Sequence, residues 1–146
     1  MSTQTPALPR TDTAGRGLAK NAAVTAAVAT IGNLAIWANT SAAVDVPDRF
    51  TPLQPGSVVF MTILGVILAA VAYRVLAGRS ATPAATFRKI VPIALVASFV
   101  PDIMIWASAG YDGAAKAETV LPLMAMHVLA GAAVYALLPK KDRAER

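Results

Sequence analysis

The sequence predicts an all-α fold, a transmembrane four-helix bundle, and three observations lead to this prediction. Of the 146 residues, 56% are hydrophobic and only 14% are charged, whereas about a quarter of the residues in a typical soluble domain are charged. The apolar residues form four long blocks separated by charges, and each block has the roughly 20 residues needed to cross a bilayer. If each block forms a helix, its apolar side chains lie on all faces of that helix, which argues against a soluble amphipathic bundle.

The charges that flank each block set the boundaries of the expected elements. We expect a disordered cytoplasmic tail over residues 1–19, a transmembrane domain over residues 20–139 and a second cytoplasmic tail over residues 140–146. The four spans are expected at about residues 21–39, 56–76, 90–110 and 119–138. The outer loop over residues 45–55 contains three prolines, which should stiffen it into a cap over the bundle.

A cleaved signal peptide is the alternative interpretation of the first block. Residues 10–43 have a basic start, an apolar stretch and the small-residue run Ser41-Ala42-Ala43, a pattern that also precedes cleavage sites. Cleavage there would leave three spans. The length of the apolar stretch and the charge balance favour an uncleaved first helix.

The basic residues predict the orientation of the bundle. Eleven of the 13 Lys and Arg residues lie in the two tails and in the connection between the second and third spans, and only Arg49 and Lys116 lie on the other side. Because cytoplasmic loops are enriched in Lys and Arg, we expect a multi-pass plasma-membrane protein with both termini in the cytoplasm. The basic residues do not gather on one helical face, so nucleic-acid binding is not expected.

A short motif recurs in the first and third spans and suggests an internal repeat. Asn33-Leu-Ala-Ile-Trp37-Ala38 resembles Asp102-Ile-Met-Ile-Trp106-Ala107. In both, a polar side chain is followed four residues later by a tryptophan at the outer edge of the span, where such rings favour the interface. The alternative is a chance match between common residues. A true repeat predicts two similar helical hairpins related by a pseudo-twofold axis along the membrane normal.

Each span also carries one polar residue at a similar depth. Asn33, Thr62, Asp102 and His127 lie 12 or 13 residues from the cytoplasmic charge that bounds their span, or about 18–20 Å at the rise of an α-helix. Between the charges that bound the spans, Asp102 and His127 are the only Asp, Glu, His, Lys or Arg residues. These four residues are the candidates for binding a ligand or a proton. A structural clamp that fixes the register of the helices is the alternative.

Other kinds of chemistry find little support in the sequence. The chain has no cysteine and a single histidine, so thiol chemistry, Cys-ligated zinc and bis-histidine haem ligation within one subunit are excluded. We expect no catalytic residues, no metal and no cofactor. The expected partners are the lipid bilayer and either further copies of the chain or another membrane protein.

Several segments resemble a family of small actinobacterial integral membrane proteins of unknown function. The resemblance covers residues of about 20–139 and is carried by Asp45-Val-Pro, Phe50-Thr-Pro-Leu-Gln-Pro-Gly-Ser-Val58, Val-Pro-Asp102 and Met126-His127. It implies four spans and no assigned activity. Two functions therefore stay open: a non-catalytic structural or accessory membrane component, or a small proton-coupled transporter or lipid or small-solute binding protein that uses Asp102 and His127.

Overall fold

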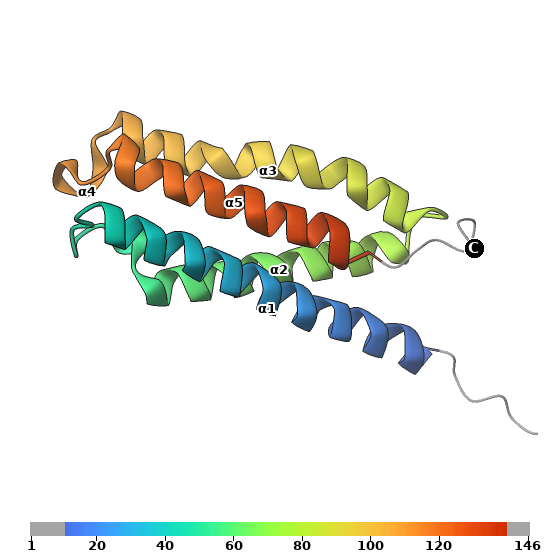
Figure 1. The fold of residues 1–146 in the computed structure, drawn as a ribbon. Coiled ribbons are helices and arrows are strands. Elements are labelled where there is room, and N and C mark those ends of the chain that lie inside the picture. The colour runs from blue at the N-terminus through green and yellow to red at the C-terminus, as the bar shows by residue number, and fades with distance from the viewer. Residues whose placement is uncertain (1–10, 140–146) are drawn as a thin grey trace, which may run out of the picture.

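The computed structural model describes residues 11–139, with side chains from residue 15 onward, and these residues form helices and no strand (Figure 1). The elements are α1 (Thr11–Ala43), η1 (Thr51–Leu53), α2 (Pro55–Ala77), α3 (Pro83–Ala107), α4 (Gly110–Gly113) and α5 (Ala117–Leu137). The helices α1, α2, α3 and α5 are long and apolar enough to cross a membrane. The predicted all-α four-helix bundle is thus confirmed.

The first helix begins earlier than the sequence suggested. α1 starts at Thr11, so the prediction of a disordered tail is wrong for residues 11–19. Leu18 and Ala22 pack against a buried cluster that contains Tyr73 and Phe87, and this packing stabilises the additional turns. The remainder of the predicted first tail and the whole of the predicted second tail lie outside the described residues.

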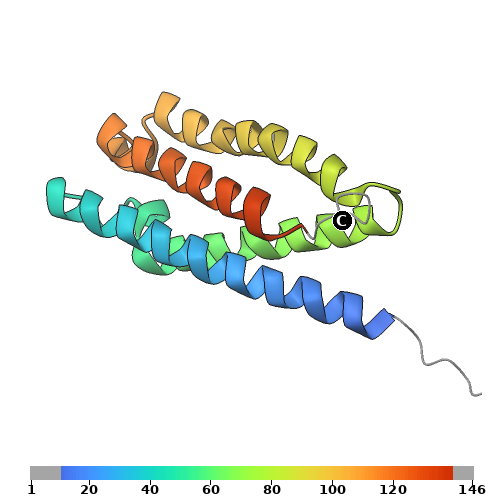
Figure 2. The same ribbon diagram turned by 45° about the vertical axis from the view of Figure 1, so that its right-hand side comes forward.

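The helices pair as two antiparallel hairpins, α1 with α2 and α3 with α5 (Figures 1 and 2). α1 also packs extensively against α5, whereas far fewer residues of α2 and α3 are in contact. A pseudo-twofold axis between the hairpins would make the α1–α5 and α2–α3 interfaces equivalent. The bundle is therefore closed on the α1–α5 side and open on the α2–α3 side.

A glycine on α1 allows close packing against α5. A Cβ atom built on Gly32 would lie 2.8 Å from both methyl carbons of Leu129, so the leucine side chain straddles the bare backbone of α1. Small residues allow membrane helices to approach closely, and close packing is a main source of their association. Gly65 on α2 is the opposite case, because a Cβ atom there would meet nothing within 4 Å.

The outer end of the bundle is capped by the proline-containing loop. Phe50 and Leu53 are fully buried in a cluster with residues from α2 and α5, and the ring of Phe50 meets Tyr111 edge-on at 5.3 Å. Ala109, directly after the C-cap residue Ser108, has left-handed backbone angles, a conformation that a right-handed helix cannot continue. α3 accordingly ends at Ala107, three residues before the predicted end of the third span.

Candidate functional site

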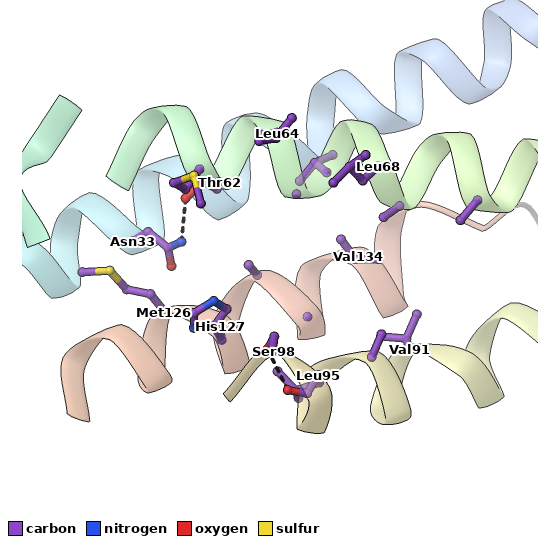
Figure 3. A pocket seen from close by; sticks show the side chains of 18 of the residues that line it. Asn33, Thr62, Leu64, Leu68, Val91, Leu95, Ser98, Met126, His127 and Val134 are labelled. Atoms are coloured by element: carbon purple, nitrogen blue, oxygen red, sulfur yellow. Dashed lines mark hydrogen bonds between the residues drawn. The ribbon is translucent and has the colours of Figure 1, made fainter. Parts of the chain in front are cut away.

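A cavity of 560 Å³ occupies the open side of the bundle between α2, α3 and α5 (Figure 3). Its walls are mostly aliphatic, and its polar lining residues are Asn33, Thr62, Ser98 and His127. Three of the four polar residues predicted from their depth thus border one cavity. Met61 and Leu68 also line it and remain 61% and 60% exposed, so the cavity opens sideways to the region that lipid chains occupy in a bilayer.

Asn33 of α1 and Thr62 of α2 form a hydrogen-bonded pair at one end of the cavity. The Thr62 hydroxyl lies 2.6 Å from the carbonyl oxygen of Val58, and a carbonyl can only accept. Thr62 must therefore donate to Val58, which leaves its oxygen to accept from Nδ2 of Asn33 at 2.9 Å. This chain of donors and acceptors fixes the orientation of the Asn33 amide.

The other end of that amide has no partner. Oδ1 of Asn33 is buried and accepts no hydrogen bond from the described residues, and the whole residue is only 3% exposed. Figure 3 shows this oxygen pointing away from Thr62, toward the part of α5 that holds Met126 and His127. A buried polar atom without a partner costs about 1–3 kcal/mol. An unused hydrogen-bond acceptor is therefore buried in the wall of the cavity.

Asp102 of α3 and His127 of α5 form the second polar pair. Oδ2 of Asp102 lies 3.1 Å from Nδ1 of His127, while the same ring nitrogen lies 3.0 Å from the carbonyl oxygen of Leu123. Since that carbonyl only accepts, Nδ1 carries a proton. The ring N–H is aimed at Leu123, and Oδ2 makes no aligned hydrogen bond. The contact between the two side chains is an ion pair when both ring nitrogens carry a proton.

The two polar pairs lie at corresponding places in the two hairpins. In the second pair, one side chain is much more exposed than the other. The Asp102 side chain is 7% exposed and that of His127 is 40% exposed. His127 lines the cavity, whereas Asp102 does not. The carboxylate thus lies outside the lining of the cavity and contacts the imidazole, which is part of that lining. The second ring nitrogen, Nε2, has no hydrogen-bond partner among residues 15–139.

Two further observations concern the residues around the site. Trp37 packs against the outer cluster and Trp106 is exposed, and neither lines the cavity. Ser98 and Gly65 do line it and were not among the candidates. The one signal for Gly65 was a glycine in the middle of an apolar span, where glycine weakens a helix. Within residues 15–139, no group of three His, Asp or Glu side chains is placed to hold a metal ion.

Four helices long and apolar enough to cross a membrane, joined in pairs by buried polar contacts, are consistent with a multi-pass membrane protein. The sequence matches the family of unknown function DUF6069 over residues 13–144, so the chain belongs to that family. The comparisons with curated proteins and with solved structures give no match.

Proposed function

We propose that the protein is a non-catalytic component of the plasma membrane whose cavity binds a lipid or another small amphiphile from the bilayer. The observation that carries this proposal is the laterally open cavity between α2 and α3. Its 560 Å³ falls within the range of about 300–1,000 Å³ typical of small-molecule sites, as does its mostly apolar wall with a few polar groups. A ligand could enter from the hydrocarbon region without crossing a polar surface.

The arrangement of charges supports the proposed location and orientation. Lys20, Arg79 and Lys89 lie near one end of the bundle, and Arg49 and Lys116 near the other. The acidic residues Asp45, Asp48, Asp112 and Glu118 accompany the second group. Only Lys and Arg count strongly in membrane orientation, and their excess supports cytoplasmic termini. The single histidine and the lack of cysteine support a role without catalysis.

Filling the cavity tests the proposed binding. Gly65→Leu adds a side chain where a Cβ atom meets no neighbour within 4 Å, on the cavity wall. We expect this variant to keep its fold and to lose most ligand binding, because the new side chain occupies the site. Binding is measured by photolabelling with three probes, which are photoreactive alkyl chains of equal length ending in a hydroxyl, a methyl ether or a carboxyl group. The labelled residues are mapped by mass spectrometry.

Gly56→Leu is the matched control. Gly56 lies on the same helix, also has no atom within 4 Å of a built Cβ, and does not line the cavity. This control should label at the cavity residues as the wild type does. The proposal is wrong if none of the three chains labels the cavity in the wild type, or if Gly65→Leu and Gly56→Leu label equally.

Proton-coupled transport is a second candidate, favoured by the contact between Asp102 and His127. A carboxylate behind a histidine that faces a cavity is an arrangement that can exchange a proton, since histidine changes charge near neutral pH. This function requires proton flux in vesicles containing the wild type, measured with an internal pH dye, and its loss in Asp102→Asn. Vesicles with wild-type protein that show no more flux than empty vesicles would exclude it.

A further inference from the structure

We propose that the cavity selects an uncharged amphiphile with a hydroxyl group, a long-chain alcohol in its simplest form, whose O–H donates to Oδ1 of Asn33. This inference rests on the proposed binding function and names the ligand class of that site. It follows from three features of the cavity: which polar atoms have unused capacity, what charges lie beside them, and where the apolar walls extend.

Of the buried polar atoms that line the cavity, one has unused hydrogen-bonding capacity, and it is an acceptor. The hydroxyl of Thr62 donates to Val58 and that of Ser98 donates to the carbonyl oxygen of Leu95 at 2.7 Å. Oδ1 of Asn33 is the buried acceptor without a donor. A ligand that supplies an O–H there removes an unsatisfied polar atom, whereas an ether or a hydrocarbon leaves it unsatisfied.

The charges near the cavity favour a neutral ligand. Asp102 and His127 form the ionisable pair of this region, so a protonated ring already has an anion beside it. A carboxylate ligand would bring a second negative charge toward Asp102 and would place its own acceptor oxygens against the acceptor Oδ1 of Asn33. Burying that additional charge at this depth would cost several kcal/mol. A hydroxyl group avoids both penalties.

The apolar walls show where the chain of the ligand would lie. From Thr62 the α2 wall continues through Leu68 to Ala72, ten residues later and about 15 Å away along the helix. Val91 and Val134 provide the opposing walls from α3 and α5. Asn33 lies at the other end, so the hydroxyl would be held near the polar pairs and the chain would extend toward the cytoplasmic side.

The test compares the three photoreactive chains in the full-length protein purified in detergent. We expect the alcohol to reach half-maximal labelling of cavity residues at a concentration about tenfold below that of its methyl ether, the effect of one hydrogen bond to a buried acceptor. Asn33→Ala should remove this preference. Asn39→Ala is the matched control, because Asn39 lies on the same helix and outside the cavity, and it should keep the preference.

The comparison of alcohol with ether in the wild type needs no variant, so it decides the inference even if Asn33→Ala does not fold. Equal labelling by alcohol and ether, or stronger labelling by the carboxylic acid, would overturn the hydroxyl preference and leave the proposed binding function intact. A preference for the alcohol that persists in folded Asn33→Ala would also overturn it. Failure of all three chains to label the cavity would overturn both.

Discussion

Replacing His127 with leucine should lower the free energy of unfolding by about 3 kcal/mol, because the substitution leaves the buried carboxyl group of Asp102 without its partner. Oδ2 of Asp102 lies 3.1 Å from the His127 ring, and the Asp102 side chain is 7% exposed. A carboxyl group so placed must either keep its charge in a region of low polarity or take up a proton. Both outcomes cost free energy in the folded state.

The double variant Asp102→Leu/His127→Leu should recover most of this loss. Removing both partners removes the uncompensated group, and apolar side chains of similar size often replace a buried pair at little cost. Stability is measured by denaturant unfolding in mixed micelles, followed through the fluorescence of Trp37 and Trp106. If His127→Leu unfolds like the wild type, or if the double variant is less stable than both single variants, the two side chains are not energetically coupled.

Phe99→Leu controls for the packing of the imidazole ring. The Phe99 ring meets that of His127 edge-on with 6.3 Å between their centres, so its loss weakens the same contact surface without touching the carboxylate. Edge-on ring contacts contribute about 0.5–1.5 kcal/mol beyond burial. We therefore expect Phe99→Leu to cost clearly less than His127→Leu.

The depth of each polar residue could be predicted from the sequence, but the direction in which its side chain points could not. Counting residues from a boundary charge fixes depth, because an α-helix rises by a constant amount per residue. The count predicted a similar depth for Asn33 and Thr62 and for Asp102 and His127, and in the structure the members of each pair are in contact. Rotation about each helix axis depends on packing between helices, and apolar residues on all faces give no signal for it.

The cavity was not predictable for the same reason. Its existence depends on the unequal α1–α5 and α2–α3 interfaces, and the internal repeat suggested that these would be alike. The difference arises from single side chains, such as Leu129 packed against Gly32 on one side and nothing packed against Gly65 on the other. The early start of α1 was missed because the composition of residues 1–19 resembles that of a disordered segment, while the packing of Leu18 is a tertiary contact.

Gly32→Val should destabilise the bundle by about 2 kcal/mol, the usual cost of inserting carbon atoms into a well-packed interface. A Cβ atom on this residue would lie 2.8 Å from both Leu129 methyl carbons and 3.4 Å from Cγ, so the entire leucine side chain must move or α1 must shift away from α5. Valine adds two further methyl groups to this clash. The loss is measured by denaturant unfolding in micelles.

Leu129→Ala provides the test of this explanation, because it removes the atoms that valine would meet. In the Gly32→Val background it should restore stability, and the two changes should differ from additivity by about 1–2 kcal/mol, as expected for residues in direct contact. Gly56→Val, where a built Cβ meets no neighbour, should stay within about 0.5 kcal/mol of the wild type. Additive effects of Gly32→Val and Leu129→Ala would show that the α1–α5 interface does not depend on this contact. The close packing of α1 against α5 would then have to arise from other residues.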